Sequence, residues 1–440
     1  MQCPPWASTA RSSVYSHRPG DGEEVSDIMN VHDKNILITG ASGFVGSLLA
    51  KKLIDEGANV FGILRRRADG TKPNNLRRIG IAGEVHLIEG DLVNISSIGN
   101  ALSACGPDII YHLGAQSFVP RSFEDPLETI SWNCNGTANL LEAVRMKDMD
   151  PVIVFAGSSE EYGLVVSSKD HYEKLLSERR VVFPEPQIIP ELPISETNPL
   201  RPMSPYAVSK VFGDFIMRNY HENYGIRTIV SRAFNHEGAG RGIMFVTSVA
   251  TSQVMKLKFG EADSIAIGNV NAFRDWSHVS DIVDGYVLLA EKGRHGDVYN
   301  QGSMRTNSVM SYLLMSLEEG GYPISKIESH SGDKVIENPT ALDRSPIFGV
   351  DFEKTRIDDM MLRGELEFAP KDKCVIVHTD SRTIKIIFDP AKFRPAEVPV
   401  LLSDSTKINN LGFKTRCSLR DIIADQLNNY LSENERKSLY

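Results

Sequence analysis

The stretch Ile36-Leu37-Ile38-Thr39-Gly40-Ala41-Ser42-Gly43-Phe44-Val45-Gly46 decides the fold, because it combines an apolar strand, a glycine-rich turn and the start of a helix. Its glycines are spaced three apart. Lacking side chains, they let the backbone approach a pyrophosphate and let the helix pack closely, while the helix N-terminus supplies free N–H groups and positive potential. We therefore expect a dinucleotide phosphate site formed by Gly40, Gly43, Phe44, Val45 and Gly46.

Short apolar runs alternate with longer amphipathic ones downstream of this stretch. The predicted strands are residues 36–39, 60–64, 85–89, 109–113, 152–156 and 228–233. This rhythm predicts an α/β fold of the Rossmann type, a doubly wound parallel sheet with helices on both faces. Such sheets bind ligands at the carboxyl ends of their strands.

The pattern also suggests a division into parts. We expect a disordered extension over residues 1–33, a nucleotide-binding domain over 34–234, and a smaller C-terminal substrate-binding lobe within 235–440 that sends some segments back to the first domain. Two stretches, about 165–190 and about 332–382, exceed the usual length of connections. We interpret them as insertions.

Composition narrows the function classes. The chain has 440 residues with 57 acidic against 48 basic side chains, and its net charge of -9 argues against a general affinity for nucleic acid or anionic membrane. The five cysteines are scattered and lack metal-ligand spacing, so neither a disulfide framework nor a metal site is expected. No apolar run is long enough to span a bilayer. A cytoplasmic enzyme fits these observations best.

Three arginines, Arg65-Arg66-Arg67, stand at the end of the second predicted strand. An enzyme that binds NAD would offer a carboxylate there to the ribose hydroxyls. Guanidinium groups would instead pair bidentately with a 2′-phosphate. We therefore expect NADP as the cofactor, bound by Arg65 and Arg66. The alternative interpretation is a solvated basic loop.

Two further motifs carry candidate catalytic groups. Tyr206 and Lys210 are four residues apart on one face of a predicted helix, and the nearby positive charge is expected to lower the tyrosine pKa. Ser158 and Glu160 follow the strand 152–156, and alternation along an extended chain would point both to the same side. The alternative interpretation makes Ser158 a helix cap and Glu160 a surface acid.

A glutamate at this position is informative because simple hydride transfer does not need one. Tyr206 could move a proton from a sugar hydroxyl while hydride passes to nicotinamide. Once C4 of the sugar is a ketone, its C5 proton is acidic, and Glu160 could remove it and help water leave from C6. Hydride returned to C6 would complete a redox-neutral dehydration.

These motifs together resemble the extended short-chain dehydrogenase/reductase family over most of residues 35–431. Within it, Phe234-Asn235-His236-Glu237, Arg241-Gly242, Phe245-Val246-Thr247, Gly268-Asn269, Arg274-Asp275-Trp276 and Arg394-Pro395-Ala396-Glu397 are similar to the GDP-mannose 4,6-dehydratases. The resemblance implies a lyase that converts GDP-mannose to its 4-keto-6-deoxy product with bound NADP. The catalytic residues would be Ser158, Glu160, Tyr206 and Lys210.

The resemblance also implies binding residues. The cofactor would contact Asp91, Leu92, Leu113, Ala115, Ser117, Tyr206, Lys210, His236 and Arg241. The nucleotide sugar would contact Ser158, Asn235, Val246, Asn269, Arg274, Arg394 and Glu397, with the arginines at its pyrophosphate. A homodimer or homotetramer is the family expectation.

Some residues depart from the dehydratase pattern, namely Met244, Phe273 and Glu128, and these departures leave the substrate open. Three other functions therefore remain. A GDP-4-keto-6-deoxymannose reductase would share Ser158 to Gly163 and would consume reduced cofactor. A nucleotide-sugar epimerase would keep the C6 hydroxyl. A silent NADP-binding scaffold would perform no reaction.

Overall fold

The computed structural model describes residues 31–65, 73–178, 180–393 and 398–431. Its largest sheet has seven parallel strands in the order β11-β6-β5-β4-β1-β2-β3. The predicted parallel sheet is thus confirmed. Its strands are β1 (Asn35–Thr39), β2 (Asn59–Leu64), β3 (His86–Glu89), β4 (Ile109–His112), β5 (Val152–Ala156), β6 (Thr228–Ala233) and β11 (Val298–Gln301).

Helices cover both faces of this sheet, because successive side chains of each buried strand point to opposite faces. Ile36 and Ile38 of β1 belong to the core beneath the first group of helices, whereas Leu37 belongs to the core on the other face. The first face carries α1 (Phe44–Asp55) and α10 (Val279–Lys292). The second carries α3 (Ile95–Cys105), α6 (Gly136–Met146) and α8 (Pro205–Tyr224).

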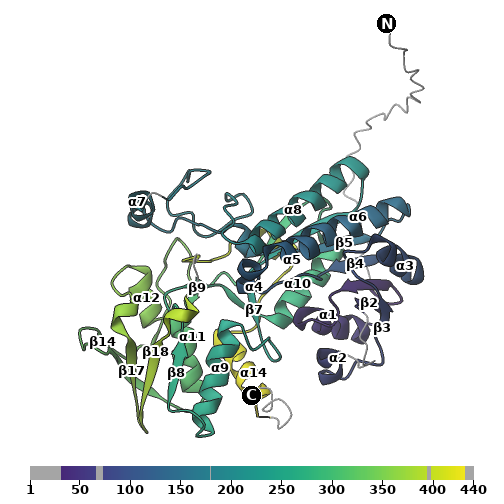
Figure 1. Ribbon diagram of the computed structural model, residues 1–440. Helices are drawn as coiled ribbons and strands as arrows, with labels where there is room; N and C mark the ends of the chain where they lie inside the picture. The colour runs from purple at the N-terminus through teal and green to yellow at the C-terminus, as the bar shows by residue number, and fades with distance from the viewer. Residues whose placement is uncertain (1–30, 66–72, 179, 394–397, 432–440) are drawn as a thin grey trace.

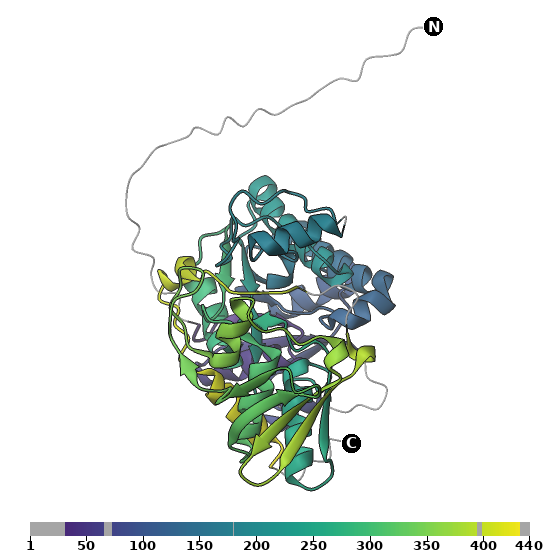
Figure 2. The same ribbon diagram turned by 90° about the vertical axis from the view of Figure 1, so that its left-hand side faces the viewer.

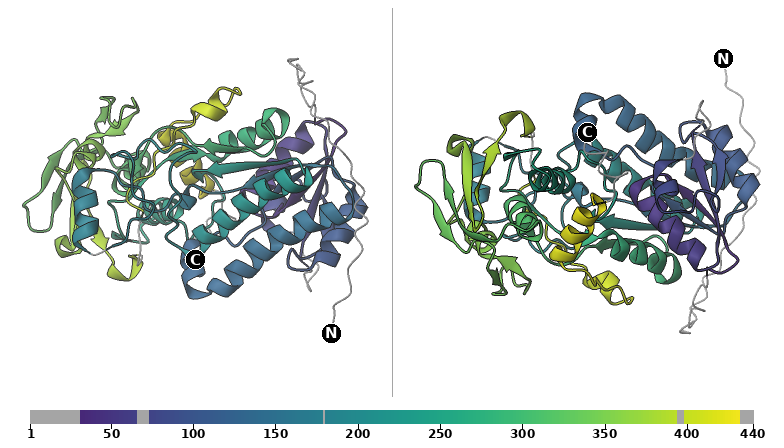
Figure 3. Two further views of the ribbon diagram at one scale, coloured as in Figure 1. Left: turned by 90° about the horizontal axis from the view of Figure 1, so that it is seen from above. Right: turned by 90° about the horizontal axis from the view of Figure 1, so that it is seen from below.

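The smaller lobe lies beside the domain that contains the seven-stranded sheet, as the views from above and below make clear (Figure 3). Its sheet has the order β14-β13-β17-β18-β8, and its helices enclose a large apolar core. The strands are β8 (Ser264–Ile267), β13 (Ile324–Ser329), β14 (Val335–Glu337), β17 (Cys374–Thr379) and β18 (Thr383–Phe388). The helices are α9 (Val246–Lys258), α11 (Val309–Glu319) and α14 (Leu419–Asn429).

The two stretches interpreted as insertions have different roles in the fold. Residues 332–382 supply β14 and β17 to the lobe's sheet, with α12 (Arg356–Leu362) between them. The described residues of 165–190 form an arm around α7 (Lys169–Ser177), which stands out at the upper left of Figure 1 and faces the viewer in the upper part of Figure 2. A small apolar cluster that includes Leu175 and Val182 supports this arm.

Short elements complete the described chain. They are α2 (Asn74–Arg78), α4 (Val119–Glu124), α5 (Pro126–Ile130), a π-helical turn (Ser131–Asn135), a 3₁₀ turn (Ser159–Glu161), β7 (Asn235–Glu237), β9 (Phe273–Arg274), β10 (Trp276–His278), β12 (Asn307–Ser308), β15 (Leu342–Asp343), β16 (Lys354–Thr355) and α13 (Thr406–Asn409), with two more 3₁₀ turns at Pro370–Asp372 and Pro390–Lys392. Among the described residues, no helix combines the length and apolarity needed to cross a bilayer.

Candidate active site

A large cleft of about 1340 Å³ lies where the carboxyl ends of the parallel strands face the lobe. Every predicted site residue in the described part of the chain lines it. These are Gly40, Gly43, Phe44, Val45, Gly46, Arg65, Asp91, Leu92, Leu113, Ala115, Ser117, Ser158, Glu160, Tyr206, Lys210, Asn235, His236, Arg241, Val246, Asn269 and Arg274. The predicted residues Arg66, Arg394 and Glu397 lie outside the described residues.

The glycine-rich turn forms a tight backbone cradle at the start of α1. Gly40 has a φ of +76°, a left-handed conformation that favours glycine. A Cβ on Gly46 would lie 2.2 Å from the carbonyl oxygen of Gly40. The helix therefore approaches the turn as closely as a bare backbone allows, and its first residues, Phe44, Val45 and Gly46, line the cleft. This geometry fits a dinucleotide pyrophosphate.

Arg65 follows β2 and sits over an aromatic ring. Its guanidinium carbon lies 4.2 Å from the centre of the Trp132 ring, which belongs to the π-helical turn between α5 and α6. Stacking on an indole holds a guanidinium in place while its N–H groups stay free to bind anions. The sequence did not point to Trp132, because the two residues meet only in the folded chain.

Ser158 and Glu160 both line the cleft, but for a different reason from the one predicted. Ser158 caps the 3₁₀ turn Ser159–Glu161, and its hydroxyl accepts a hydrogen bond from the Glu160 N–H at 3.2 Å. The chain therefore turns instead of continuing as an extended strand. The capping and functional interpretations of Ser158 thus describe the same geometry, since the cap places the Ser158 hydroxyl and the half-buried Glu160 side chain in one cleft.

The pair Tyr206 and Lys210 lies at the start of α8, one turn apart and fully within the cleft wall. The Lys210 Nζ donates to the carbonyl oxygen of Ala156 at 2.6 Å and lies 5.8 Å from the centre of the Tyr206 ring. Burial lowers the pKa of Lys210 to about 8, partly opposed by the negative charge of Glu161. The lysine is therefore hydrogen-bonded to the end of β5 and also lies beside the Tyr206 ring.

The predicted lowering of the Tyr206 pKa is wrong for this structure. Burial raises the pKa of Tyr206 to about 12, because an ionised phenolate loses its hydration in the cleft wall. A hydrogen bond with the Ser158 side chain and the positive charge of Arg241 act in the opposite direction but are weaker. Loss of a proton from Tyr206 therefore needs further positive charge beside the phenol.

Arg241 is held between the two parts of the molecule by aromatic rings. Its guanidinium carbon lies 3.6 Å from the Phe245 ring centre and 5.4 Å from that of Phe44 in the glycine-rich turn. Phe245 in turn meets Phe118 edge-on, with 5.6 Å between ring centres. The sequence missed Phe118, although it directly follows Ser117, because only the tertiary structure brings α9 against that loop.

Polar groups on the lobe side of the cleft are prepared for a ligand. The Nδ1–H of His236 donates to the carbonyl oxygen of Phe234 at 2.9 Å, and burial lowers the pKa of His236 to about 4, so the imidazole is neutral. The side-chain oxygen of Asn235 is buried and has no hydrogen-bond partner within the described chain. A buried acceptor without a partner at a cleft wall favours a ligand that donates a hydrogen bond.

Arg274 links the cleft to the segment that begins at Val398. Its Nη1 donates to the carbonyl oxygens of Phe273 and Val398 at 2.8 and 2.7 Å. Of the three departures from the dehydratase pattern, Met244 lines the cleft, whereas Phe273 is buried beside Arg274 and Glu128 forms an ion pair with Arg121 at 2.9 Å. Only Met244 therefore bears directly on what the cleft accepts.

Comparison with known proteins agrees with this architecture. Residues 36–302 match the NAD dependent epimerase/dehydratase family. The chain belongs to that family. It is therefore related to enzymes, as predicted, and the resemblance drawn from its motifs is confirmed by a GDP-mannose 4,6-dehydratase of Yersinia enterocolitica, which is 31% identical over 92% of this chain and 96% of its own length.

Solved structures share the fold. RMD from Pseudomonas aeruginosa complexed with NADPH has a TM-score of 0.60 at 22% identity and covers 90% of this chain and 98% of its own. DesIV, a dTDP-glucose 4,6-dehydratase from Streptomyces venezuelae with NAD and TYD bound, has a TM-score of 0.61 at 20% identity, covering 92% and 99%. The Rossmann-type prediction is confirmed.

Proposed function

We propose that this protein is an NADP-dependent nucleotide-sugar 4,6-dehydratase, a lyase whose substrate is GDP-mannose. The observation that carries the proposal is that Glu160 shares one cleft with Ser158, Tyr206 and Lys210, next to the glycine cradle. A reductase or epimerase needs a phenol and a hydroxyl at the sugar, but only elimination of water needs a carboxylate. The relationship to the Yersinia enterocolitica enzyme supports the same reaction.

The chain's own residues would divide the reaction between them. Tyr206 takes the proton of the C4 hydroxyl, and the Ser158 hydroxyl, which is hydrogen-bonded to the phenol, steadies the same oxygen. A bound nicotinamide cofactor, held by Lys210, His236 and Arg241, would supply the hydride acceptor for C4 and the hydride donor for C6. Glu160 removes the C5 proton and delivers it to the departing C6 hydroxyl, and the proton that Tyr206 took from the C4 hydroxyl is returned to C5, so that the net change is loss of one water and no net oxidation.

We further propose that Arg65 selects NADP by pairing with the 2′-phosphate. Its exposed guanidinium stands at the end of β2 and is oriented by Trp132. No carboxylate replaces it at that strand end in the sequence. Lys210, His236 and Arg241 would contact the cofactor, while Asn235, Asn269 and Arg274 would face the nucleotide sugar.

A homodimer is proposed from an apolar surface on α4, α5 and α8, three helices that pack against one another. Large apolar side chains on this surface are exposed to water, which is unusual for a patch built on adjacent helices. Pairing of two copies through it would bury them. These side chains are Phe123, Leu127, Ile130, Val208, Phe212 and Phe215.

The test of the reaction is to incubate the purified chain with GDP-mannose and NADP without any reductant. The expected product is the nucleotide sugar that has lost one water, detected by mass spectrometry. Glu160→Gln should lower product formation by about 10²- to 10⁴-fold while the cofactor still binds. A matched control is Glu173→Gln on the exposed face of α7, which should retain full activity. Dehydration by Glu160→Gln at the parent rate would refute the assignment, and turnover only with NADPH on a keto-sugar would favour a reductase.

A further inference from the structure

One wall of the cleft is formed by residues 268–274 of the smaller lobe. Among the described residues of this wall, Asn269 and Arg274 line the cleft, whereas Asn271 does not. The wall runs from the end of β8 to β9, so the fold of the lobe sets its position. Residues 332–382, interpreted from the sequence as an insertion, are joined to this wall by two sets of hydrogen bonds.

The first set is centred on the Asn271 carboxamide. Its Nδ2 donates to the carbonyl oxygen of Phe368 at 2.6 Å, and its Oδ1 accepts the Phe368 N–H at 2.9 Å. Phe368 belongs to the insertion and is buried in the core of the lobe. The Asn271 side chain is therefore held at both of its polar atoms by a residue 97 positions away along the chain.

Asn271 in turn fixes a residue of the cleft. The Oδ1 of Asn269 accepts the main-chain N–H of Asn271 at 3.0 Å and the Asn271 Nδ2 at 3.2 Å. These two hydrogen bonds occupy the oxygen of the Asn269 carboxamide. Its Nδ2 is then the atom that can bind a ligand in the cleft, and an amide nitrogen only donates. The wall therefore offers a hydrogen-bond donor at Asn269.

The second set of hydrogen bonds lies at the other end of the same wall. Asp358, fully buried at the start of α12, accepts the Asn307 Nδ2 at 2.9 Å and the Ser308 N–H at 2.8 Å. Asn307 pairs with Arg274 in the antiparallel ladder of β12 and β9. The insertion is thus fastened to the cleft wall at both ends, next to Asn269 and next to Arg274.

We propose that Asn271 is a positioning residue, through which the insertion holds Asn269 as a hydrogen-bond donor to an acceptor oxygen of the nucleotide sugar. The proposal deepens the proposed dehydratase function and rests on it for the placement of Asn269 at the substrate. Asn271 itself would not touch the substrate, because its neighbours Asn269 and Ala272 line the cleft and it does not.

Asn271→Ala removes one of the two hydrogen bonds to Asn269 and both hydrogen bonds to Phe368, so the Asn269 amide can rotate. We expect the Kd for GDP-mannose to rise by about 5- to 10-fold, as for the loss of one neutral hydrogen bond. KM should rise by the same factor, while kcat and the Kd for the cofactor stay within about twofold of the wild type. General damage to the fold would instead lower kcat and cofactor affinity as well.

A double-mutant cycle decides whether Asn271 acts through Asn269. Asn269→Ala should weaken GDP-mannose binding to a similar extent, and adding Asn271→Ala to it should change the Kd by less than about twofold. Two independent losses that multiply in the double variant would overturn the proposal. An Asn271→Ala chain with the wild-type Kd would overturn it too.

If Asn271→Ala does not fold, Asn271→Asp takes its place in the cycle. Its carboxylate can still accept the Phe368 N–H but cannot donate to Asn269. Any effect of the new charge on substrate binding would be present with and without Asn269→Ala, so it cancels in the cycle. The expected and contradicting outcomes are those given for Asn271→Ala.

The matched control is Asn198→Ala. Asn198 is half-buried like Asn271, its Nδ2 donates to the Glu191 carbonyl oxygen at 2.8 Å, and its Oδ1 accepts the Ser195 N–H at 3.0 Å. It is not among the described residues that line the cleft. This variant should lose stability in a thermal melt and keep the wild-type Kd for GDP-mannose.

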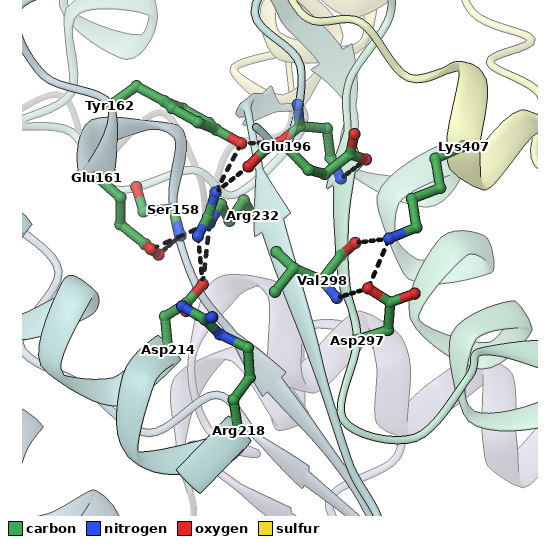
Figure 4. Close-up of polar contacts among 11 residues, drawn as sticks. Ser158, Glu161, Tyr162, Glu196, Asp214, Arg218, Arg232, Asp297, Val298 and Lys407 are labelled. Atoms are coloured by element: carbon green, nitrogen blue, oxygen red, sulfur yellow. Dashed lines mark hydrogen bonds and ion pairs between the residues drawn. The ribbon is translucent and has the colours of Figure 1, made fainter. Parts of the chain in front are cut away.

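The loop that carries Asn198 contacts a different part of the molecule, a buried ionic cluster next to the active-site 3₁₀ turn. Figure 4 shows the guanidinium of Arg232, from β6, between Asp214 of α8 and Glu161 of that turn. The Arg232 Nη1 donates to the Glu196 carbonyl oxygen at 3.1 Å, which joins the loop to the cluster. The control therefore removes a similar carboxamide away from the wall 268–274.

The binding measurement is a calorimetric titration with GDP-mannose of the chain saturated with NADPH or NADH, whichever the wild type binds. A reduced cofactor cannot accept a hydride, so the substrate binds without being consumed. Wild-type binding without dehydration in the turnover assay would refute the dehydratase, while the cycle would still decide the role of Asn271. Dehydration by the wild type with independent losses in the cycle would refute the role of Asn271 alone. A wild-type chain that does not bind GDP-mannose would overturn both.

Discussion

Gly46→Ala tests the glycine cradle most directly. The added methyl would sit 2.2 Å from the Gly40 carbonyl oxygen, whereas ordinary contact begins at 3.4 Å, so the turn must retreat by about 1.2 Å (3.4 − 2.2). The next atoms that the methyl would meet are also backbone, at 2.8 and 3.0 Å, so no side chain can rotate away to relieve the overlap. We expect cofactor affinity to fall by about 10- to 100-fold, or about 1.4–2.7 kcal/mol.

The same substitution should change the free energy of unfolding somewhat less than the free energy of cofactor binding. Overpacking costs about 1–3 kcal/mol, and the better helix propensity of alanine offsets about 1 kcal/mol of that. The assay is a fluorescence titration with NADPH beside a thermal melt. Gly83→Ala is the matched control, because a methyl there would meet nothing within 4 Å. Affinity of Gly46→Ala within twofold of the wild type would refute the close approach of helix and turn.

Three further outcomes are expected. Arg65→Ala should reduce the preference for NADPH over NADH by about tenfold or more, through loss of a charge-assisted contact of about 1.5–3 kcal/mol, and equal losses for both cofactors would contradict the 2′-phosphate role. His236→Asn should remove a stability loss of about 3 kcal/mol that the wild type suffers as pH falls from 6.5 to about 4. The loss arises because the unfolded imidazole gains a proton over this range, whereas the buried imidazole, with its lowered pKa, does not. The measurement is urea unfolding of both proteins, and a stability difference between them that stays constant across this pH range would contradict the prediction. Phe215→Glu should convert a dimer to a monomer in light scattering, whereas Leu342→Glu on the lobe should not; two unchanged masses would refute the proposed interface.

The sequence predicted the parallel sheet well because its strands are uniformly apolar and evenly spaced. Predicted residues 36–39 and 152–156 agree with β1 (Asn35–Thr39) and β5 (Val152–Ala156) to within a residue. It did not predict β11 (Val298–Gln301), the seventh strand. That short segment follows a region of irregular pattern, and its place beside β6 depends on the return of the chain from the lobe.

The candidate site also has features that the sequence predicted and features that it did not. The glycine spacing and the Tyr206 and Lys210 pair are local patterns, and both lie in the cleft. The contact of Arg65 with Trp132 joins residues 67 positions apart (132 − 65), so no local pattern could indicate it. The direction in which the pKa of Tyr206 shifts was predicted wrongly, because the charge of a neighbour is visible in the sequence whereas burial is not.

The sequence by itself determined the class of fold, the glycine cradle and which side chains could perform acid–base chemistry, since these depend on residue type and spacing along one strand, turn or helix. The tertiary structure alone decided how those groups behave. Burial sets the protonation of Tyr206 and Lys210, and the ionic cluster around Arg232 forms only when a turn, a helix and a strand pack together. The physical reason is that desolvation and charge pairing depend on distances in space, which separation along the chain does not fix.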